Sequence, residues 1–246
     1  MTGTDDAVRQ PHAVTDLASR RLKALKIERL LGLQHFPQPT RLLEIGCGSG
    51  GIAHYFATHP NLQCEVTAVD LHDNRQVHDG YSYHSVQGVK LPFADGQFNV
   101  VISNHVIEHV GESKAQLEHL QEIHRVLAPG GSAYLAVPNR WMLTEPHYRL
   151  KFLSWWPRTW RSRYLQLWGK GNFYDCEPLQ MHELEQLLDT AGFSYRNLCV
   201  EAMRATFDIE RPGHWSTRLL AAIPDGILNP LRPIIPTLIY QLWHPA

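Results

Sequence analysis

The stretch LLEIGCGSGG, residues 42–51, constrains the fold of this chain more than any other feature. A short apolar run ends in Gly46, Gly48, Gly50 and Gly51, and the following GIAHYFATH has a helical pattern. Glycines let a ligand approach the backbone closely, and the start of a helix carries partial positive charge. The pattern therefore predicts a buried parallel strand, a ligand-binding turn and a helix.

Strands and helices alternate along the chain on both sides of this turn. CEVTAVD and FNVVISN are apolar runs of strand length, and SKAQLEHLQEIHRVL repeats its apolar residues at helical spacing. This order predicts an α/β fold with a Rossmann-like doubly wound sheet, mostly parallel with an antiparallel closing strand, and helices on both faces. The expected strands cover residues 41–46, 64–70, 81–87, 98–104, 132–138, 194–203 and 237–243; the expected helices cover a leading segment that ends near Gly32, and residues 51–59, 113–127 and 179–193.

The length of 246 residues and the 43% hydrophobic content predict one domain, residues 1–246, with one sizeable core. Two segments interrupt the alternation. Residues 139–177 hold five of the seven tryptophans and are interpreted as an inserted aromatic and basic lid, and residues 203–233 as a second apolar insertion before the closing strand. The basic residues of the lid are Arg140, Arg149, Lys151, Arg158, Arg161, Arg163 and Lys170.

The composition indicates where the protein is located in the cell and which kinds of partner it can bind. A formal net charge of -1 gives no general reason to expect nucleic-acid binding. The polar N-terminal stretch is not a signal peptide, and no apolar run reaches the length of a membrane span. We therefore expect a cytoplasmic protein that is at most peripheral to a membrane. Reduced thiols are expected at the four unpaired positions Cys47, Cys64, Cys176 and Cys199.

The glycines alone fit two kinds of ligand. Gly46, Gly48 and Gly51 match the GxGxxG spacing of dinucleotide sites, whereas Glu44 with the glycines matches the ExGxGxG spacing found beside S-adenosylmethionine. A carboxylate at Glu44 would attract the ammonium group of the methionine portion and would not favour a pyrophosphate. Asp70, at the end of the second strand, can accept hydrogen bonds from ribose hydroxyls in either case.

The segments that follow favour the second ligand. VKLPFADGQFNVVISNHVIEHV and EIHRVLAPGGSAYLAVPN, together with the glycine turn, resemble the class I S-adenosylmethionine-dependent methyltransferases over about residues 40 to 140. The resemblance implies that S-adenosyl-L-methionine is the cofactor and assigns its contacts. The ribose would lie against Asp70 and the adenine against Leu71. Gln87 and Gly88 stand where family members usually have an aspartate that accepts a hydrogen bond from the adenine amino group. The methionine end would lie against Glu44, Gly46, Cys47, Gly48 and Asn104.

The second half of the chain bears on the methyl acceptor. PNRWMLTEPHYRLKFLSWWPR and the later PTLIYQLW resemble bacterial methyltransferases associated with surface polysaccharide and glycolipid clusters. This resemblance implies O-methylation of a carbohydrate, a nucleotide-sugar or a glycolipid, with an anionic or lipid-linked acceptor among the options. Two alternatives stay open: an O-methyltransferase for a small aromatic or quinone-like metabolite, and a protein that binds S-adenosylmethionine without catalysis. The oligomeric state is left open.

A hydroxyl acceptor benefits from a base while it attacks the methyl group. His147, in EPHY, is the first candidate, and His105, just after the fourth strand, is the second. His105, Glu108 and His109 have spacings that could hold a metal, but a structural role is favoured and no metal is expected. For the lid, three interpretations remain: a solvated face with buried aromatics, an anionic-substrate pocket, or a membrane-surface contact.

Overall fold

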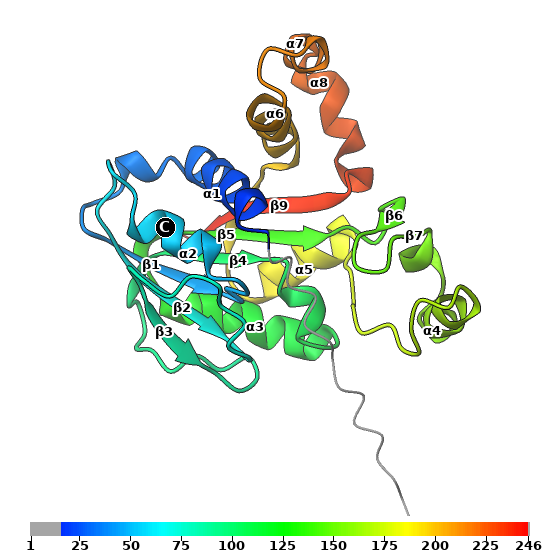
Figure 1. Ribbon diagram of the computed structural model, residues 1–246, viewed down its shortest axis with the longest axis horizontal. Helices are drawn as coiled ribbons and strands as arrows, with labels where there is room; N and C mark the ends of the chain where they lie inside the picture. Colours follow the sequence, from blue (N-terminus) through cyan, green and yellow to red (C-terminus); the bar gives the residue numbers. More distant parts are fainter. Residues whose placement is uncertain (1–15, 246) are drawn as a thin grey trace, which may run out of the picture.

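The computed structural model describes residues 16–245, which form a seven-stranded sheet in the order β3-β2-β1-β4-β5-β9-β8 (Figure 1). The first five strands are parallel, and β9 runs antiparallel between β5 and β8. This confirms the doubly wound sheet and its antiparallel closing strand. The strands are β1 (Thr40–Ile45), β2 (Cys64–Asp70), β3 (Ser82–Ser85), β4 (Phe98–Asn104), β5 (Leu127–Pro138), β8 (Ser194–Asn197) and β9 (Thr237–Trp243).

Helices cover both faces of the sheet, as expected. In Figure 1, α1 (Leu17–Leu31) and α2 (Gly51–Ala57) lie on one face, and α3 (Ser113–Val126) and α5 (Met181–Thr190) on the other. Successive residues of a strand point to opposite faces, so each strand supplies two cores. On β1, for example, Leu42 packs with α1 and α2, whereas Leu43 packs with α3 and α5.

Local signals fix the ends of these helices. The Asp16 carboxylate accepts hydrogen bonds from the N–H groups of Ala18 and Ser19 and caps α1. Gly32 ends α1 with φ +63°, a left-handed conformation that favours glycine. α5 begins with a capping box between Gln180 and Glu183.

The strand expected over residues 194–203 was wrong in its second half. β8 ends at Asn197, and α6 (Cys199–Glu210) begins two residues later. The Asn197 side chain accepts from the Cys199 N–H at 3.0 Å and so supports this helix start. Residues 199, 202 and 205 are buried, a spacing of three that fits one helix face and not the alternation of a strand.

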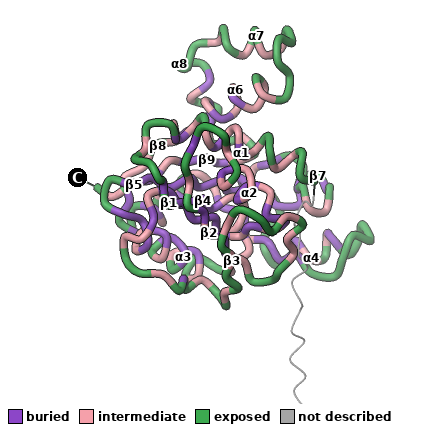
Figure 2. Tube along the Cα trace, turned by 60° about the vertical axis from the view of Figure 1, so that its left-hand side comes forward, coloured by how far each residue is buried: buried purple, intermediate pink, exposed green. Residues whose placement is uncertain are grey.

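Two segments extend from the sheet. The lid, residues 139–177, contains a hairpin of β6 (Thr144–Glu145) and β7 (Leu150–Lys151), a 3₁₀ turn (Leu153–Trp155) and α4 (Arg158–Leu167). The second segment, which we call the lobe, contains α6, α7 (Trp215–Ala222), α8 (Asp225–Leu228) and a 3₁₀ helix (Asn229–Ile234). Figure 2 shows the lobe standing away from the sheet, with most of α7 and α8 exposed.

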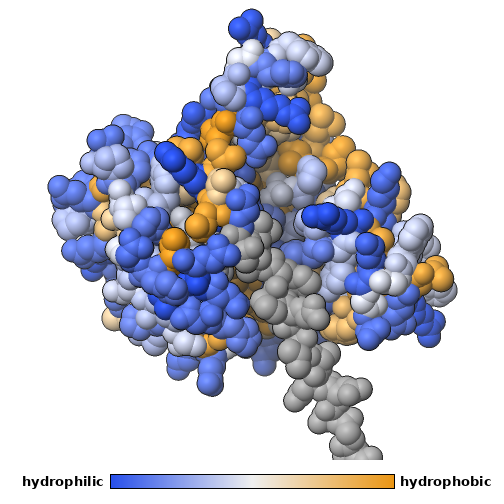
Figure 3. Space-filling model, in the orientation of Figure 1, coloured by the Kyte–Doolittle hydropathy of each residue, from blue (hydrophilic) through white to orange (hydrophobic). Residues whose placement is uncertain are grey.

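Apolar side chains remain exposed on the lobe, and Figure 3 shows apolar surface along its side. The Arg29–Asp208 ion pair, at 2.6 Å, connects its first helix to α1. Among residues 16–245, no helix is both long and apolar enough to cross a membrane. The exposed large apolar residues of the lobe are Trp215, Leu219, Ile227, Leu231 and Ile234.

Candidate active site

The glycine turn lies between the carboxyl end of β1 and the start of α2. Gly46, Gly48 and Gly50 have φ values of +72°, +52° and +78°, which other residues adopt only with strain. A Cβ atom on Gly46 would lie 2.5 Å from Cγ2 of Val106, the residue two positions past β4. The glycines are therefore needed for the close packing of the turn as well as for its backbone conformation.

Asp70 connects this turn to the end of β2. Its Oδ2 accepts from the Gly48 N–H at 2.8 Å, and its Oδ1 accepts from the Leu71 N–H at 2.7 Å. Oδ1 also accepts a long hydrogen bond from the His72 N–H at 3.5 Å, whereas Oδ2 has a further lone pair for a ligand hydroxyl. The Leu71 side chain is half exposed beside it and offers an apolar surface.

Two buried polar groups at neighbouring strand ends lack hydrogen-bond partners among the described residues. Glu44 on β1 is 2% exposed, and its Oε2 has no partner. Asn104, at the end of β4, is half-buried, and its buried amide nitrogen has no partner either. Burial raises the pKa of Glu44 to about 8, although the positive charge of Arg20 on α1 opposes this shift. An unpaired buried acceptor and donor are costly unless a ligand uses them.

The remaining residues predicted for the cofactor differ in exposure. Cys47 is buried, and burial raises its pKa, so it is a neutral thiol that packs within the turn. Gln87 and Gly88 follow β3 and are both exposed, and Gly88 has φ +70°. The structure records no hydrogen bond from Gln87 to another described side chain.

A second group of polar side chains begins just after β4. His105 has φ +60°, and its N–H donates to the Ala136 carbonyl at 2.9 Å. A 3₁₀ turn (Ile107–His109) follows, with the fully buried Glu108 at its centre. His105 Nδ1 and His109 Nε2 lie 3.3 and 3.9 Å from Glu108 Oε1. Burial acts to raise the pKa of Glu108, but the two histidines outweigh it and lower the pKa.

The lid brings His147 to this group. His147 Nδ1 lies 2.6 Å from Oε1 of Glu145, which is 1% exposed and also accepts from the Tyr148 N–H at 2.7 Å. Burial acts to lower the pKa of His147, but Glu145 outweighs it and the pKa is raised. A histidine whose Nδ1 is held by a carboxylate can accept a proton at Nε2. The pair is therefore suited to general-base catalysis.

Asp175 and Cys176 complete the group, and the sequence analysis did not assign them a role. Cys176 Sγ lies 3.8 Å from Nδ1 of both His109 and His147, and 3.5 Å from Asp175 Oδ1. The rings of His109 and His147 meet edge to face, with centroids 5.3 Å apart. His109 and Cys176 are 67 residues apart in sequence, so local spacing could not have revealed this cluster.

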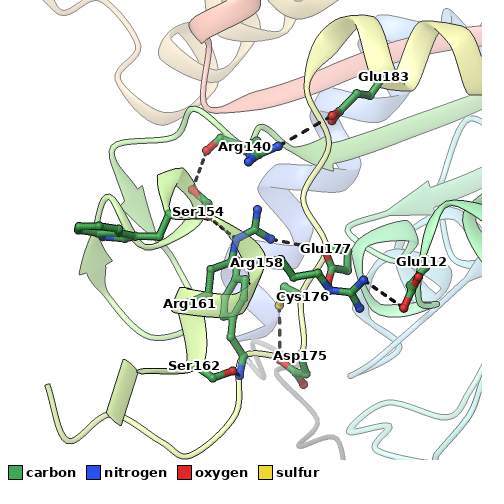
Figure 4. A network of polar contacts seen from close by, with 12 residues as sticks. Glu112, Arg140, Ser154, Arg158, Arg161, Ser162, Asp175, Cys176, Glu177 and Glu183 are labelled. Atoms are coloured by element: carbon green, nitrogen blue, oxygen red, sulfur yellow. Dashed lines mark hydrogen bonds and ion pairs between the residues drawn. The ribbon is translucent and has the colours of Figure 1, made fainter. Parts of the chain in front are cut away.

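Ion pairs hold the lid together and join it to the sheet domain (Figure 4). Arg158 binds Glu112 at 3.0 Å, and Arg140 lies 3.9 Å from Glu183 of α5, so both connect the lid to its surroundings. Within the lid, Arg158 and the buried Arg161 bind Glu177 at 2.7 and 3.4 Å. These arginines line an open groove of about 450 Å³ between the lid, α3 and α5, and glutamates already neutralise much of their charge.

The chain matches known proteins over most of this architecture. A family model described as a methyltransferase domain matches residues 16–198. A demethylmenaquinone methyltransferase of Chlorobaculum parvum is 33% identical over 167 residues, which cover 62% of this chain and 65% of that protein. The first three curated relatives are matched over only 30% to 65% of their own length.

Solved structures share the fold. An S-adenosylmethionine-dependent methyltransferase from Methanosarcina mazei gives a TM-score of 0.52 at 17% identity, covering 88% of this chain and 98% of that one. A Haemonchus contortus phosphoethanolamine N-methyltransferase, solved with S-adenosylhomocysteine, gives 0.51 at 17% identity, covering 90% of this chain and 52% of that one. With the glycine turn, Asp70 and the sheet order, these matches show that the chain belongs to the class I S-adenosylmethionine-dependent methyltransferases.

Proposed function

We propose that this chain transfers a methyl group from S-adenosylmethionine to a hydroxyl group of a carbohydrate, a nucleotide-sugar or a glycolipid. The observation that carries the proposal is the Glu145–His147 pair, with 2.6 Å between Oε1 and Nδ1. An alcohol hydroxyl is a weak nucleophile, so its attack on the methyl group gains from a base that removes its proton. The family supplies the methyl donor, and the pair supplies the base.

The carboxyl ends of β1, β2 and β4 are assigned to the cofactor. Glu44 would accept from the ammonium of the methionine portion, and the Asn104 amide would donate to its carboxylate, which satisfies both buried groups. Asp70 would accept from the ribose hydroxyls while it holds the turn through Gly48. Leu71 and Gln87 would flank the adenine. The residues present therefore fit a zwitterionic nucleoside ligand.

The assignment of His147 as the base follows from its partners. Glu145 orients the ring and favours its protonated form, so a proton taken from the acceptor would be stabilised. The raised pKa of His147 makes it a stronger base toward the acceptor's proton. His105 has its Nδ1 directed to the fully buried Glu108 and is assigned a positioning role for the turn after β4.

The lid supports a carbohydrate acceptor through its exposed rings. Trp156 and Trp160 are stacked with an interplanar angle of 17°, and both are more than 40% exposed. Exposed aromatic faces are platforms for the apolar face of a sugar ring. Arg163 lies 6.0 Å above the Trp160 ring and adds a positive charge for an anionic acceptor. The exposed apolar lobe is compatible with a lipid-linked acceptor at a membrane surface.

Formation of S-adenosylhomocysteine from S-adenosylmethionine tests the proposal. Wild-type protein is incubated with nucleotide-sugars, with a glycolipid extract, and with phenols and quinols. Turnover is expected with a member of the first two sets, and the rate should fall about 100-fold or more in His147→Gln. His35→Gln, an exposed histidine beyond the amino end of β1, is the matched control. Turnover only with phenols or quinols, or a fully active His147→Gln, would contradict the proposal.

A small quinol-like acceptor is the second candidate, because the relative with 33% identity is a demethylmenaquinone methyltransferase. The same acceptor panel separates the two functions. Binding of S-adenosylmethionine without turnover of any acceptor would favour a non-catalytic protein of this fold, since a shared fold does not determine the reaction.

A further inference from the structure

We propose that His109, Asp175 and Cys176 form a binding site for a divalent metal ion of borderline softness, with zinc as the best-fitting ion. One ligand atom of each residue lies within 4.8 Å of the others. From the sequence no metal was expected, because a structural role was favoured for His105, Glu108 and His109; Asp175 and Cys176 were not considered as ligands. The inference extends the proposed active site, since His147 lies against the same sulfur.

The distances suit a tetrahedral ion. Zinc binds thiolate sulfur at about 2.3 Å and nitrogen or oxygen at about 2.0 to 2.2 Å, so two of its tetrahedral ligand atoms lie about 3.5 Å apart when one is sulfur. Cys176 Sγ is 3.8 Å from His109 Nδ1 and 3.5 Å from Asp175 Oδ1. Both distances to the sulfur are within a few tenths of an ångström of this value, and all three ligand atoms lie within 4.8 Å of one another. Three protein ligands leave a fourth position for water or substrate.

Three buried acids lie close to the proposed site. Glu108, Glu145 and Asp175 are at most 9% exposed, and the negative charge of each raises the pKa of the Cys176 thiol. Among residues 16–245, the cationic groups near these acids include three histidines, which carry charge only when protonated, and Lys23 of α1, whose charge acts on Glu108. The negative potential of buried carboxylates favours a divalent cation beside them.

A second shell is already in place for His109. Its Nδ1 faces the sulfur, and its Nε2 lies 3.9 Å from the buried Glu108 carboxylate, whose oxygens have no hydrogen bond of good geometry from the described residues. Metal-binding histidines usually present their second ring nitrogen to a carboxylate in this way. Tyr148 Oη donates to Asp175 Oδ1 at 3.1 Å and orients the oxygen ligand.

Glu145, His147 and Cys176 make an alternative group around the same sulfur. There, however, the 2.6 Å contact between His147 Nδ1 and Glu145 is a hydrogen bond, which requires a proton on Nδ1. A protonated nitrogen cannot bind a metal. We therefore assign the ion to the His109 group and keep His147 as the neighbouring base.

Cobalt titration of the full chain, after removal of bound metal with a chelator, tests the site. One Co²⁺ per chain should bind, give a thiolate-to-cobalt charge-transfer band, and be displaced by Zn²⁺. The band should disappear in Cys176→Ser, and affinity in His109→Ala should fall by more than about 100-fold. Cys64→Ser, a half-buried cysteine at the start of β2, is the matched control and should keep the band.

Two further variants test which residues bind the metal ion. Glu108→Gln should weaken cobalt binding about 10- to 100-fold, as expected for an outer-shell carboxylate, and His147→Gln should keep the band. A band that persists in Cys176→Ser, or one that is lost in His147→Gln and kept in His109→Ala, would overturn the assignment. Calorimetry with S-adenosylhomocysteine separates this test from the proposed function, because a chain that binds the nucleoside and no metal refutes only the metal site.

Discussion

Glu44 should make nucleoside binding depend on pH. The side chain is 2% exposed, and burial raises its pKa from 4.5 to about 8 despite the charge of Arg20. In the proposed site its carboxylate accepts from the ligand's ammonium, so the ligand binds the ionised form. Glu44 must therefore lose a proton when S-adenosylhomocysteine binds at neutral pH, and affinity should rise as the pH rises toward the pKa.

The pKa of Glu44 sets the size of this effect. At pH values below this pKa of about 8, each decrease of one pH unit weakens binding by about 1.4 kcal/mol, which raises the dissociation constant about tenfold. Between about pH 5.5 and about pH 7.5, affinity should rise about 75-fold. A carboxyl with the ordinary pKa would already be ionised, and affinity would change by only about 10%.

Isothermal titration calorimetry measures both the affinity and the proton release. In two buffers of different ionisation enthalpy at about pH 6.5, close to one proton should be released for each ligand bound. Glu44→Gln keeps the side-chain volume and removes the titrating group, so its binding should be weaker and nearly independent of pH. All other groups are the same in both proteins, so their contributions cancel in the comparison. If the dissociation constant changed equally with pH in the wild type and in Glu44→Gln, the reasoning would be refuted.

Three further predictions concern neighbouring positions. Asp70→Asn should weaken S-adenosylhomocysteine binding at least about tenfold in calorimetry, because charged acceptors contribute about 1.5 to 3 kcal/mol per hydrogen bond; exposed Asp79→Asn is the control. Gly46→Ala should lower the free energy of unfolding by about 1 to 3 kcal/mol in urea, given its φ of +72° and the contact with Val106; a loss below about 0.5 kcal/mol would contradict the packing argument. Burial lowers the pKa of His119 to about 4, so stability should fall by about 3 kcal/mol as pH drops from about 6.5 to about 4, and His119→Gln should lack that part of the acid sensitivity.

The strand ends and the glycine turn that are proposed to hold the cofactor could be predicted because their signals are local. A strand, a glycine turn and a helix occupy adjacent residues, and parallel strands bring their carboxyl ends to one edge. Glu44 and Asp70 therefore follow from their places at strand ends. The Asn99 side chain accepts from the Arg41 N–H at 3.0 Å and joins β4 to β1.

His147 was the first candidate base in the sequence, but its grouping with His109 and Cys176 could not be predicted, because the group is assembled from distant segments. His109 follows β4, His147 lies in the lid hairpin, and Cys176 follows α4. Periodicity and spacing describe neighbours along one element, and they contain no information on which loops meet. The same limit explains the error at α6, where an apolar run of strand-like composition packs one helical face against β9.

The lid arginines gain a structural role from this assembly. Arg158 and Arg161 both bind Glu177, which directly follows Asp175 and Cys176, and Arg161 is 4% exposed. The Gln116 amide also donates to the Glu177 carbonyl at 3.0 Å. The segment that supplies the sulfur and the carboxylate is thus fixed to α3 on one side and to α4 on the other. Because a displacement of one ångström would break the distances of the proposed metal site, these contacts would support the site by holding the segment in place.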